Sequence, residues 1–166
     1  MKYLLITHIH SDHVKKVTLE KIKKLFPRIK IIGNHEVHQV FGVDIVANAS
    51  YAIDIDDYTF LPFECDHNVL TYGYVWTFLE YNIIYVTDTS NLNNAPKMKY
   101  DFLFLESNHD EFKVEQILNN RDQYGYDAYS NAKRHLSTQQ AKAFYYMYRR
   151  NKDSKLIELH QSSRFY

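Results

Sequence analysis

The 166-residue sequence has little of several features that commonly define a class of protein. Its single cysteine, Cys65, excludes a disulfide within the chain, and we expect a buried thiol in a reducing compartment, the cytoplasm. The 20 basic and 20 acidic side chains cancel, so the formal net charge is zero. This balance excludes a chain-wide electrostatic attraction to nucleic acid, and any such binding must use a local patch.

Long hydrophobic runs are also absent. No apolar stretch approaches the roughly 20 residues that a membrane-spanning helix needs, and the first residues lack the apolar core of a signal peptide. We therefore expect no membrane as a partner. Prolines and glycines are few, and none of them marks a linker. With 45% hydrophobic residues, the sequence predicts a single domain that spans residues 1–166.

Short apolar runs alternate with amphipathic segments, which predicts an α/β fold. Ser137 and Gln140 fit a capping box at the start of the clearest helix, and Asn34 is suited to cap a shorter one. A hairpin is expected to turn at Tyr81–Asn82. Strands are expected at 3–7, 30–32, 52–56, 59–65, 72–80, 83–87, 102–105 and 156–159, and helices at 18–26, 34–41 and 137–150.

Basic residues are concentrated in one early segment of the chain. The cluster consists of Lys15, Lys16, Lys21, Lys23, Lys24, Arg28 and Lys30. Glu20 is the only acidic residue among them. One interpretation is a solvated surface, and the other is a basic side that faces a polyanion.

The segment from His8 to His13 brings four potential metal ligands together directly after an apolar run. Imidazole and carboxylate groups together suit Zn, Mn or Fe. Alternation places His8 and His10 on the same side of an extended loop, and a turn at Ser11 lets Asp12 and His13 face a second position. One strand end could thus begin two neighbouring metal sites. The alternative is a solvent-exposed loop that is rich in histidine.

The string HIHSDH resembles the HxHxDH motif of the metallo-β-lactamase superfamily. Matching pieces follow in order along the chain. His67 in Cys-Asp-His-Asn resembles the third histidine of that family, and Asp88 in Tyr-Val-Thr-Asp-Thr resembles its bridging aspartate. His160 in Glu-Leu-His-Gln-Ser-Ser-Arg-Phe resembles the last ligand and is similar to the ending of ribonuclease Z.

Two further segments resemble the nuclease branches of this superfamily. Arg134-His135-Leu136-Ser137 resembles their additional histidine motif, and residues 105–110 look like a segment of the YycJ-like exonucleases. By contrast, flavodiiron-type redox members have a carboxylate at the second motif position, where this chain has His10. The pairing of Asp12 with His13 favours a phosphodiesterase over a lactamase.

The resemblance implies two divalent metal ions, Zn or Mn, held by seven side chains. The first ion would take His8, His10 and His67; the second would take Asp12, His13 and His160. Asp88 would bridge both, and such an anion is needed because ions about 3.5–4 Å apart repel each other. A water acidified there to a hydroxide would attack phosphorus. The implied catalytic residues are His135, Asp12 and Asp88.

Several other residues are candidates for contacts with substrate. His135 could donate a proton to the leaving oxygen, or it could simply precede a helix. Ser162 and Arg164 could hold a phosphate, or they could form a surface pair. Asn108 and His109 are further substrate-binding candidates, although His109 could instead orient a metal ligand. For base stacking, the candidates are Tyr124, Tyr126 and Tyr129, near Arg121.

The predicted fold is a trimmed αββα metallo-β-lactamase sandwich that lacks most N-terminal strands, because only one strand fits before His8. Such a sandwich exposes an apolar sheet face or an unpaired edge, so we expect a homodimer or higher oligomer. The predicted function is a binuclear metal-dependent phosphodiesterase that hydrolyses nucleic acid, in the manner of an exonuclease. The alternatives are a phosphodiesterase for small cyclic or linear nucleotides and a non-catalytic metal-stabilised binding protein.

Overall fold

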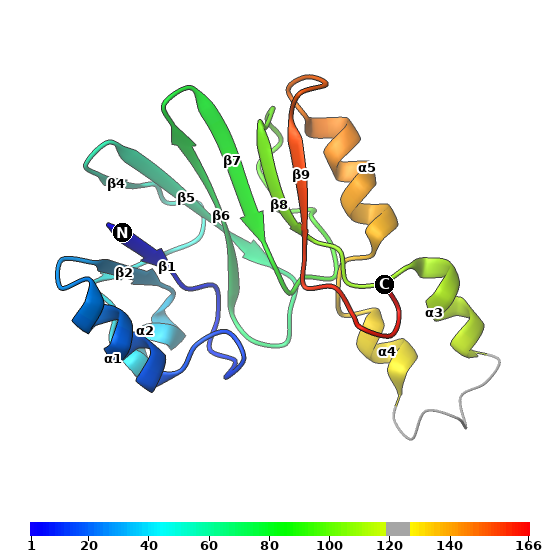
Figure 1. Ribbon diagram of the computed structural model, residues 1–166, viewed down its shortest axis with the longest axis horizontal. Helices are drawn as coiled ribbons and strands as arrows, with labels where there is room; N and C mark the ends of the chain where they lie inside the picture. The colour runs from blue at the N-terminus through cyan, green and yellow to red at the C-terminus, as the bar shows by residue number, and fades with distance from the viewer. Residues whose placement is uncertain (119–126) are drawn as a thin grey trace.

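The computed structural model describes residues 1–118 and 127–166, and in it two β-sheets lie face to face between helices (Figure 1). The smaller sheet is parallel and has the order β1-β2-β3. Its strands are β1 (Tyr3–Leu5), β2 (Lys30–Gly33) and β3 (Ile45–Val46). The larger sheet contains six strands in chain order, β4 (Ile53–Ile55), β5 (Tyr58–Cys65), β6 (Thr71–Phe78), β7 (Tyr81–Val86), β8 (Phe102–Glu106) and β9 (Lys155–Leu159).

Helices α1 (Lys16–Leu25) and α2 (His35–Phe41) cover the outer face of the smaller sheet, and α5 (Thr138–Tyr148) covers the outer face of the larger one, which gives the expected αββα arrangement. Helices α3 (Glu111–Leu118) and α4 (Ala128–Ala132) contact each other and lie to the side of the sheets (Figure 1). No helix in the described part of the chain is both long and apolar enough to cross a membrane.

The alternation of side chains along the strands separates three hydrophobic layers. In β2, Ile31 contacts the α1–α2 layer, whereas its neighbour Ile32 lies between the two sheets; both are fully buried. In the larger sheet, Leu103 belongs to the layer that contains Phe144 of α5. Cys65 lies in this last layer, where burial raises its pKa to about 12, so the expectation of a buried thiol is confirmed.

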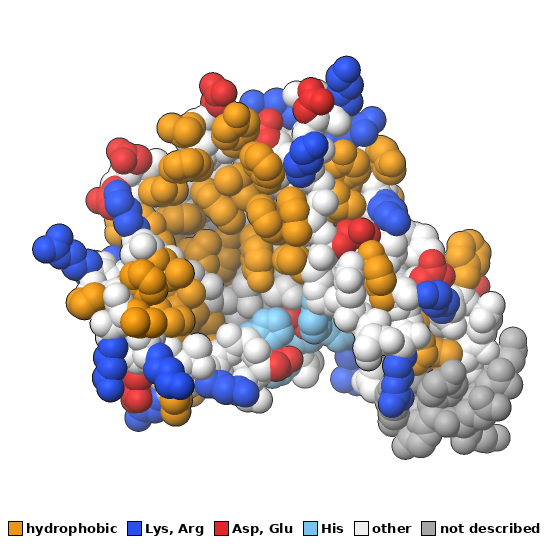
Figure 2. All heavy atoms as spheres, in the orientation of Figure 1, with side chains coloured by type: hydrophobic (Ala, Val, Ile, Leu, Met, Phe, Trp, Pro, Cys, Tyr) orange, Lys and Arg blue, Asp and Glu red, His pale blue; other side chains and the backbone are white. Residues whose placement is uncertain are grey.

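The smaller sheet covers only part of the larger one. Its residues pack with those of β4, β5 and β6, while on the same face of β7, β8 and β9 the apolar side chains remain partly exposed. They are Ile83, Tyr85, Phe102, Phe104 and Ile157. Figure 2 shows the resulting apolar surface, with histidine side chains at its lower margin. This open sheet face is the exposed apolar surface that the sequence predicts.

Local signals predict the helix starts better than the hairpin turn. Asn34 accepts a hydrogen bond from the Val37 amide, and Ser137 and Gln140 form the expected capping box. The predicted turn at Tyr81–Asn82 is wrong by two residues: Phe78 pairs with Tyr81, so residues 79–80 form the loop. Leu79 has a left-handed backbone there (φ 55°), a conformation that a leucine in the sequence does not indicate.

Candidate metal centre

One edge of the larger sheet collects most of the polar side chains singled out above. Strands β5, β7, β8 and β9 all run toward this edge, because β5–β6–β7 are antiparallel in turn and β7–β8–β9 are parallel. His67 follows β5, Asp88 follows β7 and His160 follows β9, while Glu106 is the last residue of β8. The loop after β1 brings His8 to His13 to the same place.

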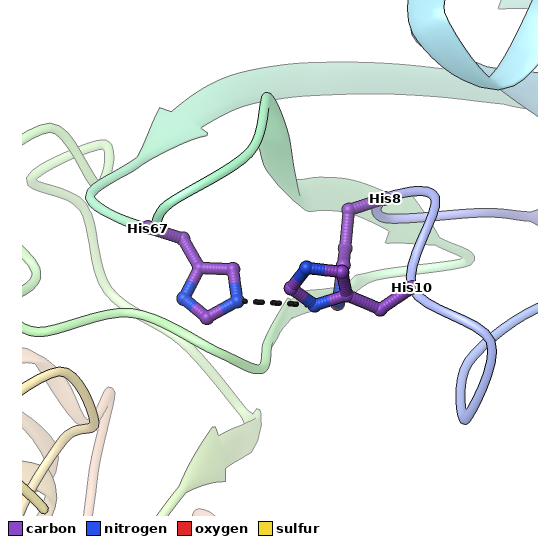
Figure 3. A group of neighbouring side chains, drawn as sticks. All are labelled: His8, His10 and His67. Atoms are coloured by element: carbon purple, nitrogen blue, oxygen red, sulfur yellow. Dashed lines mark hydrogen bonds between the residues drawn. The ribbon is translucent and has the colours of Figure 1, made fainter. Parts of the chain in front are cut away.

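The first cluster consists of His8, His10 and His67, whose ligand nitrogens all lie within 4.8 Å of one another. Figure 3 shows His67 reaching from the loop after β5 toward the two histidines of the N-terminal loop. His67 Nε2 lies 3.4 Å from His10 Nδ1. These are the three residues that the resemblance assigns to the first ion.

The second cluster consists of Asp12, His13 and His160, which also lie within 4.8 Å of one another. His13 Nε2 is 3.6 Å from Asp12 Oδ2 and 3.0 Å from Asp88 Oδ2. The Asp12 side chain is 72% exposed, so this cluster opens to solvent, whereas His8 of the first cluster is fully buried. The geometry therefore brings the predicted second ligand set together as well.

Asp88 adjoins histidines of both clusters. Its Oδ2 faces His13 and accepts a hydrogen bond from the Thr87 hydroxyl at 2.9 Å, while its Oδ1 lies 3.2 Å from His160 Nδ1. Asp88 also groups with His8 and His13 within ligand distance. Burial alone would raise its pKa, but the hydrogen bond from His13 and the charge of His160 hold the pKa far below its usual range. Asp88 is therefore an anion that faces both clusters.

Asp88 and His160 share an unusual backbone conformation. Their φ angles are 54° and 53°, in the left-handed region that side chains other than glycine rarely adopt. Such residues cost about 1–3 kcal/mol each and concentrate at functional sites. Asp88 and His160, which the sequence predicts to be metal ligands, thus have a backbone conformation typical of functional sites.

Glu106 is a component that sequence reasoning missed. It is fully buried, and its Oε1 accepts hydrogen bonds of 2.7 Å from Nδ1 of both His135 and His160. The amides of Thr89 and Leu136 donate to Oε2. Burial raises the pKa of Glu106, but the bonds from the two histidines outweigh this and lower it. Since a carboxylate only accepts, both histidines carry their proton on Nδ1 and present Nε2 on the far side of the ring.

The donor atoms suit divalent metal ions. His8 Nδ1 lies 3.0 Å from the Thr7 hydroxyl, whereas His8 Nε2 is buried and has no hydrogen-bond partner among the described residues. Burial, reinforced by the charge of His13, lowers the pKa of His8 to about 4, so its ring is neutral near pH 7. With the proton on Nδ1, which can donate to the Thr7 hydroxyl, Nε2 offers a lone pair. Burial likewise lowers the pKa of His67. An unpartnered lone pair beside two further imidazoles fits Zn or Mn.

Two adjoining cavities open beside the clusters. One, of about 270 Å³, we term the metal-side cavity; its walls include His10, Asp12, Asp88 and Arg134. The other, of about 330 Å³, we term the amide cavity; it is lined by Asn108, Ala132, Gln161, Ser162, Ser163 and Phe165. Asn131, His135 and His160 form walls of both. His135 therefore stands where the two cavities meet.

The structure separates the predicted substrate-binding residues into two groups. Ser162 and Asn108 line the amide cavity, although the Asn108 amide also donates to the His160 carbonyl at 2.9 Å. Arg164 and His109 line neither cavity, and His109 is only 2% exposed, with Nδ1 unpartnered among the described residues. Among the described residues that line the two cavities, Arg134 is instead the only lysine or arginine.

Only one of the tyrosines proposed for base stacking belongs to the described part of the chain. Tyr124 and Tyr126, together with Arg121, lie outside the described residues. Tyr129 is in α4, and the Lys133 ammonium lies 5.4 Å from its ring centre. It does not line either cavity.

No family model matches the sequence, and no curated protein matches it. Solved structures do. The metallo-β-lactamase fold protein YhfI from Bacillus subtilis superposes with a TM-score of 0.68 at 16% identity, over 98% of this chain and 66% of that one. Human tRNase Z, short form, gives 0.69 at 18% identity, over 98% and 73%. A diphosphatase from the PhnP family gives 0.66 at 18% identity, over 99% and 62%.

These similarities extend over almost all of this chain. They show that it has the metallo-β-lactamase fold, as its motifs predict. The chain spans between 62% and 73% of the length of these three structures.

Proposed function

We propose that the protein is a metal-dependent hydrolase that cleaves phosphodiesters, with nucleic acid as its substrate. The observation that carries this proposal is the pair of ligand clusters that both adjoin one buried anion, Asp88. Divalent ions at such a pair activate a water molecule and stabilise negative charge on phosphate. His8, His10 and His67 would hold one ion, and Asp12, His13 and His160 the other, with Asp88 shared between them.

The remaining polar residues of the centre act on the substrate or on the ligands. Glu106 fixes the rings of His135 and His160 through their Nδ1 atoms. His135 can then donate a proton from Nε2 to the leaving oxygen as the phosphorus–oxygen bond breaks. Water supplies the oxygen that joins phosphorus, and one of its protons restores His135.

Arg134 favours an anionic substrate. Its side chain is exposed, makes no hydrogen bond or ion pair within the described residues, and lines the metal-side cavity. A free guanidinium beside a metal centre is suited to a phosphate oxygen. Two of the similar structures are named as a tRNase and a diphosphatase, which supports a phosphate-bearing substrate. Small nucleotides remain the second candidate, because both cavities are modest in size.

The first test combines metal analysis with a substrate panel. Protein saturated with Mn or Zn should retain about two ions per chain, because the two clusters share one bridging anion, and it should hydrolyse bis-p-nitrophenyl phosphate. Labelled single-stranded DNA, RNA and cyclic nucleotides then identify the substrate. A stoichiometry that stays at one ion would refute the binuclear centre. If the protein binds two ions but hydrolyses no member of the panel, the result would instead support the alternative of a non-catalytic metal-stabilised binding protein.

We also propose that a second copy of the chain covers the open sheet face of β7–β9. Its half-exposed Tyr85 and Phe104 form part of an apolar surface of the kind that marks an interface. Light scattering at micromolar concentration should give the mass of a dimer or a higher oligomer. Phe104→Lys should shift the protein toward monomer, while Phe112→Lys, an exposed position on α3, should not. A monomeric unsubstituted protein would reject this assembly.

A further inference from the structure

The amide cavity differs in chemistry from the metal-side cavity. The metal-side cavity is charged, since it contains Asp12, Asp88 and Arg134. As far as the structure describes them, the walls of the amide cavity contain neither a carboxylate nor a lysine or arginine. Apart from the histidines and Ala132, they present amides, hydroxyls and one aromatic ring. A cavity of this composition suits an uncharged group that both donates and accepts hydrogen bonds and has a flat apolar face.

His135 determines which part of a substrate the amide cavity would receive. Its Nδ1 is held by Glu106 at 2.7 Å, so its free nitrogen is directed away from that carboxylate, and the ring forms a wall of both cavities. A proton donor must lie between the reacting phosphorus and the leaving group. With the phosphate in the metal-side cavity, the leaving group extends past His135 into the amide cavity.

Hydrogen bonds within the protein fix the walls of the amide cavity, and some polar atoms of these walls can still form hydrogen bonds to a ligand. The Phe165 carbonyl accepts a bond of 2.6 Å from the Asp110 amide, which ties the C-terminal segment to the start of α3. Ser162 Oγ accepts from the amides of Arg164 and Phe165 at 3.3 Å, so its proton remains available to a ligand. Asn108 uses its amide nitrogen on His160, which leaves its Oδ1 as an acceptor.

We infer that the amide cavity is the leaving-group subsite and that it accepts a nucleoside, with the base against Phe165. This inference rests on the proposed function. It states that the nucleoside is the group expelled: the bond from phosphorus to the nucleoside oxygen breaks, water oxygen joins phosphorus, and the nucleoside oxygen takes the proton of His135. Aromatic rings stack with any base, so the subsite recognises a nucleoside without requiring a particular sequence.

The methyl ester of thymidine monophosphate tests this inference, because it has two ester bonds to the same phosphorus. A nucleoside in the amide cavity predicts thymidine and methyl phosphate as products, in an excess of about tenfold over thymidine monophosphate and methanol. Phe165→Ala should bring the product ratio close to one, and Phe165→Tyr should restore it. Phe112→Ala, an exposed phenylalanine on α3, should keep the ratio of the unsubstituted protein.

The product ratio is measured within one reaction, so loss of metal or of folded protein does not change it. Thymidine monophosphate and methanol as the main products, or a ratio that Phe165→Ala leaves unchanged, would overturn the subsite while the hydrolase stands. If no hydrolysis occurs, the proposed function and the leaving-group role both fail, and ligand-observed NMR then tests only whether the amide cavity binds a nucleoside. Thymidine binding that Phe165→Ala abolishes supports the nucleoside site, and the absence of binding to the unsubstituted protein refutes it.

Discussion

Asparagine in place of Asp88 is expected to reduce both metal retention and hydrolysis. The substitution removes the charge of a carboxylate whose Oδ2 is 3.0 Å from His13 and whose Oδ1 is 3.2 Å from His160. The same carboxylate groups at ligand distance with His8 of the first cluster. Several kcal/mol of charge stabilisation would be lost, which corresponds to about a 10³-fold fall in turnover. Asparagine tolerates the left-handed backbone at this position, so the local fold should survive.

Metal content after dialysis and initial rates on bis-p-nitrophenyl phosphate measure the two effects of Asp88→Asn together. Asp57→Asn makes the same chemical change at an exposed position between β4 and β5 and should have neither effect. Thermal unfolding followed by circular dichroism checks that both variants are folded. A folded Asp88→Asn protein that keeps both ions and full turnover would remove the bridging role.

Alanine in place of His135 is expected to separate metal binding from turnover. In our proposal His135 contacts Glu106 and the leaving group but no ion, so metal content should be unchanged. Turnover should fall by about 10²–10⁴, the usual contribution of general acid catalysis. The fall should be smaller for a p-nitrophenyl ester, because p-nitrophenolate leaves without a proton.

The geometry around His135 also allows the opposite result, in which His135 is itself a metal ligand. His135 Nδ1 lies 3.6 Å from Asp88 Oδ1, and the two residues group with Glu106 and His160 at ligand distance. Loss of an ion from His135→Ala, or an equal slowing of good and poor leaving groups, would make His135 a ligand or a structural residue. His38→Ala, in α2 and outside both cavities, should change neither metal content nor turnover.

The placement of the ligand residues could be predicted because their signal is local. His8, His10, Asp12 and His13 lie within six positions after a strand, so the turn of one loop determines which of them point together. His67, Asp88 and His160 each follow a strand, and the strand directions bring those ends to one edge. The resemblance supplied the pairing, and the sheet order explains why it is geometrically possible.

Glu106 and Arg134 both lie in segments that resemble the nuclease branches, but the sequence assigns neither residue a role, because their partners in the centre are distant along the chain. Glu106 ends an apolar strand, and its role depends on the parallel register that pairs it with Leu159, one residue before His160. Arg134 lies beside His135 in the chain, but only the fold shows that it, rather than Arg164, reaches a cavity wall. Both depend on contacts between residues that are distant in the sequence.

The left-handed backbone at Asp88 and His160 sets stability against activity. Glycine at either position would relieve the conformational strain, but it would remove a ligand of the centre. Glycine at position 88 would also remove the partner of His13, and glycine at position 160 would remove a hydrogen bond to the buried Glu106, so the relief of strain would be offset by the loss of these contacts. Aspartate and histidine are among the side chains that accept this conformation most readily. The two positions thus hold residues that limit the loss of stability while keeping the chemistry.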